Sequence, residues 1–328
     1  MIFIVMGLAS CVSEEEYDDN AQGNFEALWH IMDEHYCFFN EKQALYGVDW
    51  NEVHERYAKQ VNGSMNKYQL FEVLTNMLAE LRDGHVNLST AFDLGRNWSW
   101  HEDYPSNFSD TLYNKYIGTD YRIASTLRYR ILDDNVGYVR CESFDIDFGA
   151  GNLDEIMSYL APCNGLIIDV RNNGGGYISS AEELAARFTN ENLLVGYMQH
   201  KTGTGHQDFS SLKEQWLKPS KGMRWQKRVV VLTNRSVFSA ANEFVKYMRC
   251  CPQAIIVGDH TGGGAGMPFS SELPNGWGVR FSACPMYDKD KNSTENGIEP
   301  DHKVSITDED FIKGKDTIIE FARQLLQK

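Results

Sequence analysis

The sequence predicts an α/β fold whose C-terminal part contains a mostly parallel sheet, preceded by a helical region. From residue 136 onward, short apolar runs alternate with stretches of helical periodicity, a pattern typical of right-handed βαβ units. Before residue 95, apolar residues recur at the spacing of one helix face. The 328 residues are enough for one large domain or two of ordinary size.

Composition places the chain among soluble globular proteins, with 42% apolar and 23% charged residues. The formal net charge of −15 would repel a phosphate backbone, so nucleic acid is excluded as a partner. The seven cysteines show no C-x-x-C metal spacing. We therefore expect free, buried thiols, with no disulfide framework, no metal site and no cofactor.

Residues 1–20 are predicted to form a lipoprotein signal and an acidic tether. The apolar run from Ile2 to Ala9 is too short to span a bilayer but has the length of a signal-peptide core. Leu8-Ala9-Ser10-Cys11 resembles a bacterial lipobox, although no Lys or Arg precedes the apolar run. That resemblance implies lipidation of Cys11 and a membrane anchor in the bacterial cell envelope, in the outer membrane, the periplasm or at the cell surface. The alternative is a frayed apolar terminus with an incidental cysteine.

Residues 21–95 are predicted to be an N-terminal helical subdomain. NFEALWHIMDEHYCFF and YQLFEVLTNMLAELRD both carry apolar residues at a period of 3.6. Residues 96–135 are rich in Trp, Tyr, Asn, Asp and Ser without a clear period, and are expected to form a connecting segment of short strands and loops that covers a site.

Residues 136–328 are predicted to be the α/β core. VGYVRCESF, GLIIDV, RVVVLTN and AIIVGD are expected strands, and NLDEIMSYLA, SSAEELAARFT and SAANEFVKYMR are expected helices. Later, SELPNGWGVRFSAC contains a Pro-Asn-Gly turn between alternating segments and predicts a hairpin. The last helix is expected in TIIEFARQLLQ.

Three predicted strands are followed by glycine clusters or a serine. Ligands of α/β sheets bind beyond the carboxyl ends of the strands. Gly174 to Gly176 follow one strand, Ser239 follows the next, and GDHTGGGAGMP follows the third. Consecutive glycines let backbone N–H groups approach a ligand. Ser239, read alone, is more often a helix N-cap than a nucleophile held near unpaired backbone donors.

A nucleophilic serine needs a base, and His85 is the histidine best placed for that role. It sits in LRDGHVNL, where Gly84 is expected to end a helix and release His85 into an extended segment. Read alone, such a histidine is more often structural than catalytic.

Several segments occur in the order found in the tail-specific, or C-terminal processing, peptidase family, which the chain resembles over roughly residues 70–305. These segments are LRDGHVNL, GYVRCESFD, LIIDVRNNGGGY, VVVLTNRSVFSAANEF, IIVGDHTGGGAG and ENGIEPDHKV. The resemblance implies a crotonase-like core, a nucleophile at Ser239, and an oxyanion hole from backbone N–H groups of Gly175 or Gly176 and of Ala240.

One feature departs from the processing peptidases: the position of their catalytic lysine is Gly264, and Lys246 lies too far along the Ser239 helix to replace it. The tricorn core branch uses a histidine base and a glutamate, bridged by a serine. His85 matches the histidine, Glu295 matches the glutamate and Glu299 is the fallback. The bridging serine falls at Gly84, so a Glu–His link would be direct or through water. His85 is expected to ionise near neutral pH.

The leading hypothesis is an exported serine endopeptidase that hydrolyses polypeptides through Ser239, His85 and Glu295. Fewer than fifty residues separate Leu88 from Val136, too few for the PDZ domain of many family members, so we expect none. The first alternative is a non-catalytic binder of peptides or apolar ligands on the same scaffold. The second, an acyl-CoA enzyme of the crotonase class, fits the fold but not the motifs. The sequence leaves the oligomeric state open.

Overall fold

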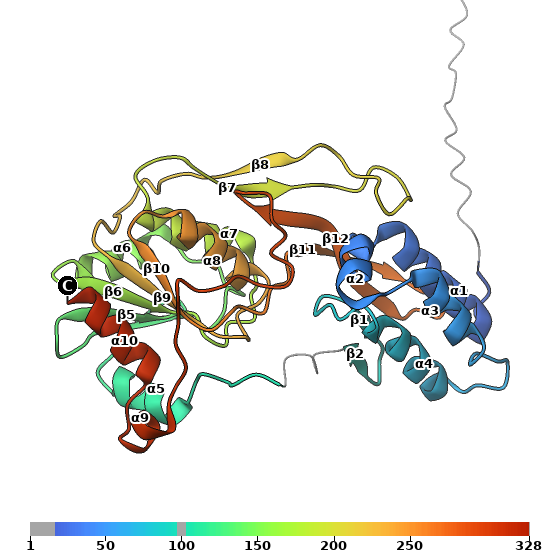
Figure 1. The fold of residues 1–328 in the computed structure, drawn as a ribbon, viewed down its shortest axis with the longest axis horizontal. Coiled ribbons are helices and arrows are strands. Elements are labelled where there is room, and N and C mark those ends of the chain that lie inside the picture. Colours follow the sequence, from blue (N-terminus) through green and yellow to red (C-terminus); the bar gives the residue numbers. More distant parts are fainter. Residues whose placement is uncertain (1–16, 97–102, 328) are drawn as a thin grey trace, which may run out of the picture.

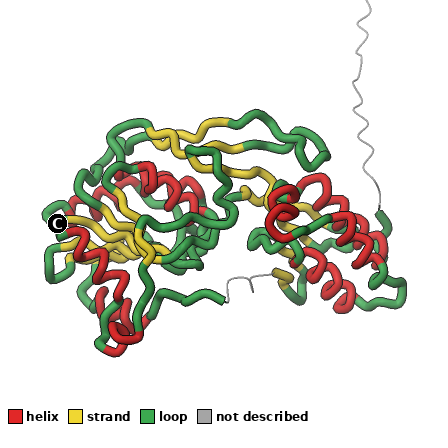
Figure 2. Tube along the Cα trace, viewed as in Figure 1, coloured by secondary structure: helices red, strands yellow, loops and turns green. Residues whose placement is uncertain are grey.

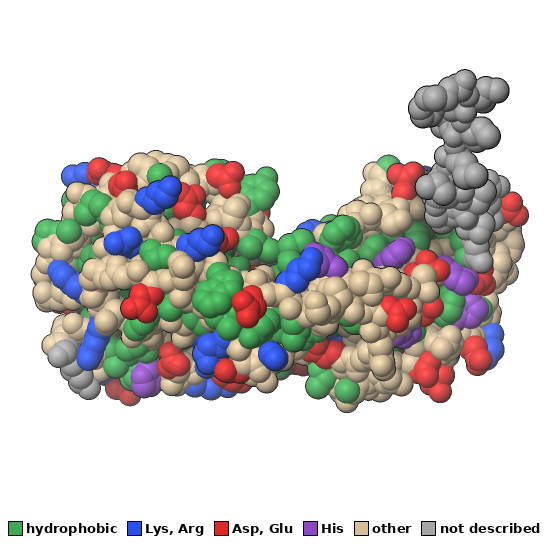
Figure 3. Space-filling model, turned by 90° about the horizontal axis from the view of Figure 1, so that it is seen from above, with side chains coloured by type: hydrophobic (Ala, Val, Ile, Leu, Met, Phe, Trp, Pro, Cys, Tyr) green, Lys and Arg blue, Asp and Glu red, His purple; other side chains and the backbone are tan. Residues whose placement is uncertain are grey.

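The computed structural model describes residues 17–96 and 103–327, which form two lobes joined by an antiparallel sheet (Figure 1). Cys11 lies outside the described residues. Figure 2 shows the helices of the N-terminal lobe gathered at one end of the molecule and a strand-centred core lobe at the other. From above, the space-filling surface narrows and is hollowed between the lobes (Figure 3).

The N-terminal lobe begins with four helices whose ends follow local signals. Asn20, Asp49 and Asn66 each cap a helix by accepting hydrogen bonds from first-turn N–H groups. The apolar faces of the helices pack together and against a strand of the joining sheet. The helices are α1 (Ala21–His35), α2 (Phe39–Tyr46), α3 (Trp50–Ala58) and α4 (Lys67–Ala79).

The joining sheet is antiparallel and draws its strands from both halves of the chain. Its order is β2-β1-β12-β7-β8, and β11 pairs with β12. β11 and β12 form the hairpin predicted around Pro-Asn-Gly, with Gly276 at φ 79° in the turn. The strands are β1 (Asn87–Ser89), β2 (Leu94–Arg96), β7 (Leu193–Met198), β8 (Lys213–Leu217), β11 (Gly266–Glu272) and β12 (Gly278–Asp288).

The core lobe is built on a seven-stranded mixed sheet of order β13-β10-β9-β6-β5-β4-β3. Neighbours from β13 to β5 run parallel, whereas β4 and β3 are antiparallel. The strands are β3 (Arg122–Ala124), β4 (Leu127–Ile131), β5 (Val136–Arg140), β6 (Gly165–Asp169), β9 (Val229–Thr233), β10 (Ala254–Gly258) and β13 (His302–Lys303).

Helices cover both faces of this core sheet. Alternate residues of β6 and β9 face opposite sides, so Leu166 and Val229 pack with one helix set and Ile167 and Val230 with the other. One face carries α6 (Ala150–Leu160), α7 (Ile178–Ala185) with the 3₁₀ turn Ala186–Phe188, and α8 (Ala240–Cys250). The other carries α5 (Asp110–Ile117), α10 (Thr317–Leu326) and, next to them, α9 (Asp308–Ile312).

The observed architecture confirms an α/β fold with an N-terminal helical region and corrects two details. The predicted mostly parallel sheet is mixed, and a second, antiparallel sheet accompanies it. Within the N-terminal region, residues 87–89 and 94–96 are strands. Residues 87–89 (β1) pair with β12, and residues 94–96 (β2) pair with β1. The aromatic-rich segment, in its described part, contributes α5, β3 and β4 to the core lobe.

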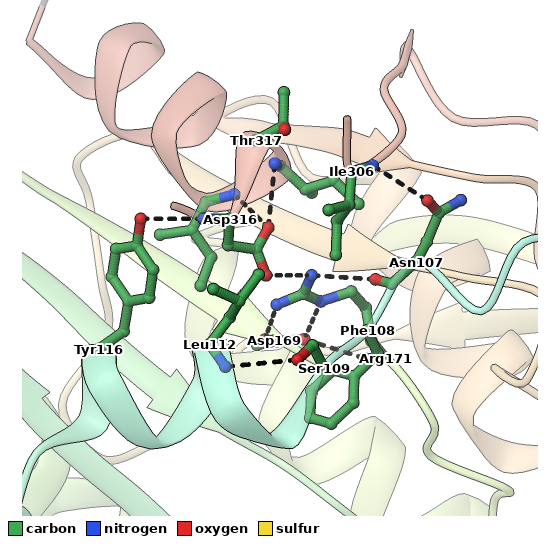
Figure 4. A network of polar contacts seen from close by, with 12 residues as sticks. Asn107, Phe108, Ser109, Leu112, Tyr116, Asp169, Arg171, Ile306, Asp316 and Thr317 are labelled. Carbon is green, nitrogen blue, oxygen red and sulfur yellow. Dashed lines mark hydrogen bonds and ion pairs between the residues drawn. The ribbon is translucent and has the colours of Figure 1, made fainter. Parts of the chain in front are cut away.

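A buried polar network fixes the end of β6 against the C-terminal helix (Figure 4). The Arg171 guanidinium pairs with Asp169 at 2.6 Å and with Asp316 at 2.8 Å, and donates to the Asn107 carbonyl at 3.1 Å. Asp316 also caps α10 by accepting from the N–H groups of Ile318 and Ile319. The network therefore anchors the chain directly before the glycine loop at residues 174–176.

The six cysteines of the described residues are all free thiols, and five of them are buried. Among residues 17–96 and 103–327, no helix is both long and apolar enough to cross a membrane.

Candidate active site

Ser239 sits at a sharp turn between β9 and α8, with φ 56° and ψ −124°. Such a conformation in a residue other than glycine costs about 1–3 kcal/mol and persists only where its surroundings enforce it. Here the Ser239 N–H donates to the Gly263 carbonyl at 2.8 Å, and Gly175 packs against the Ser239 side chain. The hydroxyl makes no capping hydrogen bond to α8. The helix-cap interpretation of Ser239 is therefore wrong, and its hydroxyl is free for another partner.

That partner is His85, whose Nε2 lies 3.0 Å from Ser239 Oγ. The two residues are 154 positions apart in the sequence, and they meet because β1, which follows His85, pairs with β12 and lines the same cleft as Ser239. The ring is 4% exposed and packs against the Phe238 ring at 4.8 Å between centroids. Its backbone N–H donates to Asp83 Oδ1 at 2.7 Å, which fixes the turn that presents the ring.

Burial lowers the pKa of His85 to about 4, with the cations of Arg280 and Lys42 acting in the same direction and Asp83 opposing them. The imidazole is therefore neutral at pH 7, the state in which Nε2 can accept a proton from Ser239. The expected ionisation near neutral pH is corrected downward because the ring is withdrawn from water. His85 Nδ1 is buried and, among the described residues, has no hydrogen-bond partner.

Glu295 is buried near this pair but binds other groups. Its Oε1 accepts from Lys42 Nζ at 3.2 Å and its Oε2 from the Ala265 N–H at 2.9 Å. Burial and the charge of Asp83 raise the pKa of Glu295 to about 8, against the opposing effect of Lys42. No hydrogen bond joins Glu295 to His85 in the described residues. The fallback, Glu299, lies at the surface, 3.7 Å from His260.

Asp83 and Lys42 are site residues that the sequence analysis missed. Asp83 Oδ2 accepts from the Tyr36 hydroxyl at 3.0 Å and from the Ser282 hydroxyl at 2.8 Å, while Oδ1 holds the His85 backbone. The Asp-Gly-His spacing was a signal for Asp83, because an aspartate readily accepts from the N–H two residues on. Lys42 gave no signal, since a lysine on a helix is usually a solvated side chain.

The Phe238 ring fills the space where the resembled families place two catalytic side chains. A Cβ on Gly84 would lie 2.7 Å from Phe238 Cζ, and one on Gly264 would lie 2.5 Å from the same ring. Gly264 also has φ 80°, which disfavours any side chain. Neither the bridging serine nor the lysine would fit without moving this ring. Lys246 is engaged elsewhere, with Glu243 at 2.6 Å and Gln215 at 3.0 Å.

The glycine loop and the first residue of α8 each hold a candidate backbone donor near Ser239. The Gly175 N–H is taken by Asn173 Oδ1 at 2.9 Å, so this residue shapes the turn and is not a free donor. Gly176 forms a parallel bridge with Phe144 that leaves its own N–H on the opposite side, and it lines the cleft. Ala240 is the first residue of α8, where N–H groups lack intrahelical acceptors. Gly176 and Ala240 therefore remain the candidate oxyanion donors.

Ser239 and His85 face a cleft of about 480 Å³ between the two lobes. One wall comes from the core lobe and the other from β1, β2, β11 and β12. No group of three or more His, Cys, Asp and Glu side chains in residues 17–96 and 103–327 could hold a metal ion. The arrangement supplies a hydroxyl, a neutral imidazole and backbone donors, which are the parts needed for acyl transfer.

Comparisons with known proteins identify the family of this chain. Residues 135–304 match the profile of peptidase family S41, and residues 17–79 match the tricorn protease C1 domain. The crystal structure of a proposed peptidase from Parabacteroides merdae ATCC 43184 is 51% identical, covers 95% of this chain and 98% of its own, and superposes with a TM-score of 0.90.

Two more distant structures share the fold. Mature CPAF is 13% identical over 94% of this chain and 96% of its own, with a TM-score of 0.72. The tricorn protease is 16% identical over 94% of this chain and 37% of its own, with a TM-score of 0.56. The family match spans more than half of this chain, and the Parabacteroides protein matches nearly all of it. The chain therefore belongs to the S41 family of serine peptidases and carries a tricorn-type C1 domain at its N-terminus.

Proposed function

We propose that this protein is an exported serine endopeptidase in which Ser239 is the nucleophile and His85 the general base. The observation that carries the proposal is the 3.0 Å separation of Ser239 Oγ and His85 Nε2 at the edge of a cleft. A distance in this range allows direct proton transfer between the two side chains. A protein that only binds ligands has no need for a neutral base aimed at a strained, uncapped serine.

In the proposed mechanism, His85 Nε2 takes the hydroxyl proton as Ser239 Oγ attacks the scissile carbonyl carbon. The carbonyl oxygen becomes an oxyanion that accepts from the N–H groups of Ala240 and Gly176. His85 then passes the proton to the leaving amine, and the acyl-enzyme is hydrolysed by water in the reverse sequence of proton transfers. By analogy with measured systems, each oxyanion donor contributes about 3–4 kcal/mol to transition-state stabilisation.

The carboxylate that supports His85 is assigned to Asp83 in this proposal, acting through position and charge. Asp83 is the carboxylate whose charge favours the protonated imidazole, and it holds the His85 backbone. Glu295 faces Lys42 instead, so its part in a Ser-His-Glu arrangement would require a rearrangement or a bridging water. Asp83 is thus a positioning residue.

The test combines an active-site probe with peptide hydrolysis. A fluorophosphonate should label the wild type and not Ser239→Ala, and peptides blocked at both ends should be cleaved by the wild type alone. Ser236→Ala is the matched control, because Ser236 is an exposed serine three residues earlier. His85→Gln should fold and label far more slowly, whereas the exposed His35→Gln should behave as the wild type. Equal labelling of wild type and Ser239→Ala would remove Ser239 as the nucleophile.

We also propose that Cys11 is lipidated and anchors the enzyme in the cell envelope. The support is the Leu8-Ala9-Ser10-Cys11 sequence followed by an acidic stretch. Cells fed an alkyne fatty acid should label the wild-type protein in the membrane fraction and not Cys11→Ser. A wild-type protein that stays in the soluble cytosolic fraction without label would refute both export and anchoring.

A further inference from the structure

One wall of the cleft carries a row of polar side chains that runs across four strands. Asn87 of β1 is the register partner of Arg96 on one side and of Arg280 on the other, and Arg280 pairs with Ser270 of β11. Directly paired residues point to the same face of a sheet. All four line the cleft that contains Ser239. The two arginines lie two strands apart, about 10 Å between backbones, a span that two long side chains can close around one small group.

Both guanidinium groups are exposed cations. Within the described residues, neither Arg96 nor Arg280 forms an ion pair or a side-chain hydrogen bond, although the chain has a net charge of −15. The one carboxylate among the described residues that line the cleft is Asp145, which belongs to the opposite wall beside Gly174 and Gly176. The cleft therefore has a positive wall and a negative wall, with the serine and histidine between them.

Arg280 is close to the reacting groups. It lines the same cleft as His85, and its charge acts on that imidazole. Arg96 belongs to β2, the outermost strand of the joining sheet, and so lies farther along the same wall. A substrate group bound between them would belong to a residue close to the scissile bond.

We infer that Arg96 and Arg280 form a subsite for a carboxylate of the substrate, with Asn87 and Ser270 as neutral hydrogen-bond partners beside them. The inference rests on the proposed peptidase function and names its substrate class: peptides with an acidic group near the cleaved bond. Guanidinium groups suit this task because their N–H donors match the two oxygens of a carboxylate. The carboxylate belongs either to an Asp or Glu side chain or to the C-terminal residue of the peptide.

The test uses matched quenched-fluorescent peptides that distinguish these two sources. One set replaces Glu by Gln at each position around the cleaved bond, and the other compares a free with an amidated C-terminus. We expect one acidic form to be cleaved with at least about tenfold higher kcat/KM than its neutral match, the size of a charged hydrogen bond. Glu over Gln identifies a side-chain carboxylate, and free over amidated identifies a chain terminus.

Variants of Arg96 assign the effect. Arg96→Glu should abolish the preference and favour a Lys peptide over the Glu peptide, and Arg96→Lys should keep part of the preference. The matched control is Lys59→Glu, which makes the same change of charge at an exposed position after α3 on the same lobe. It should leave the selectivity as in the wild type. An equal loss in Lys59→Glu would reduce the effect to overall charge.

The outcomes separate this inference from the proposed function. If Ser239 reacts with fluorophosphonate and all matched peptides are cleaved equally well, the subsite is wrong and the peptidase stands. If no labelling or hydrolysis occurs, the peptidase is wrong, and fluorescence anisotropy with the same peptides tests the subsite. Tighter binding of the acidic peptide that is lost in Arg96→Glu would support the subsite, and equal binding would overturn it.

Discussion

Lys42 and Glu295 form a buried ion pair at 3.2 Å, although 253 residues separate them. Their side chains are 1% and 3% exposed, and the pair connects α2 with the loop that follows β12. Lys42 Nζ also donates to the Arg82 carbonyl at 3.3 Å, in the segment just before His85. Glu295 was expected to orient His85, and the structure gives its carboxylate to a lysine instead.

Above about pH 8, where the paired Glu295 is ionised, removing the lysine should leave a buried carboxyl group without its opposite charge. Measured at about pH 9, Lys42→Met is expected to lower the free energy of unfolding by about 3–5 kcal/mol, as for other broken buried pairs. The double variant Lys42→Met/Glu295→Gln should recover much of that loss, because neither charge then remains buried without its partner. Urea unfolding of the wild type, both single variants and the double variant measures the coupling. Losses that simply add would show that the two side chains do not stabilise one another.

The pH dependence of activity follows from the burial of His85. Its pKa is lowered to about 4, so the neutral base persists down to that pH. The value of kcat/KM should be flat from pH 8 to about pH 5 and fall as the pH drops through about 4, where the imidazole takes a proton and can no longer accept one from Ser239. Tryptophan fluorescence recorded at the same pH values should stay native through this limb, which separates ionisation from acid unfolding.

Arg280→Gln tests the cause of this pH dependence of kcat/KM. Because the Arg280 cation lowers the pKa of His85, its removal should move the acidic limb to higher pH. A wild-type limb near the ordinary histidine value of about 6.5 would contradict the structure, since it would place a solvated ring at the site.

The candidate active-site residues could be predicted from the sequence only where a local motif indicates them. Ser239, Gly176 and Ala240 follow strands in recognisable order. The expectation that Gly84 ends the preceding helix is wrong, since α4 ends at Ala79 and Gly84 lies in the turn that presents His85. Lys42 could not be found this way, because its role depends on a partner that only the tertiary fold brings near. Asp83 lay within two residues of His85, yet its burial is set by Tyr36 and Ser282 from distant elements.

The same reasoning explains what was missed in the fold. Buried strands of the parallel core are apolar runs that local patterns reveal. The short strands β1 and β2 have no such signal and exist because β12 offers an edge for pairing. Because β1 and β2 were not predicted, the cleft wall that carries Arg96 and Arg280 was not predicted either. The deciding information was strand pairing between residues nearly 200 positions apart.

The strained backbone of Ser239 predicts how stable a glycine variant should be at this position. In an unstrained helix, Gly is about 0.5–1 kcal/mol less stabilising than Ala. At φ 56° the strain of any other residue offsets this cost. Ser239→Gly should therefore be at least as stable as Ser239→Ala, although both should be inactive. Buried Ser180 in α7 is the control site, where Ser180→Gly should be less stable than Ser180→Ala. Thermal unfolding gives both comparisons, and the same Ala-over-Gly order at both sites would contradict the strain at Ser239.

The contact between Gly84 and Phe238 predicts that a single methyl group disturbs the site. A Cβ at Gly84 would lie 2.7 Å from Phe238 Cζ, so Gly84→Ala should push the ring against its other neighbour, His85. We expect a loss of about 1–3 kcal/mol in unfolding free energy, as for other overpacked sites, together with a lower kcat. Gly63→Ala is the control, because nothing lies within 4 Å of its added Cβ. Gly84→Ala/Phe238→Leu should regain stability and part of the kcat, since the smaller side chain leaves room for the methyl group. If the double variant is no more stable than Gly84→Ala, the aromatic ring is not what excludes a side chain from position 84.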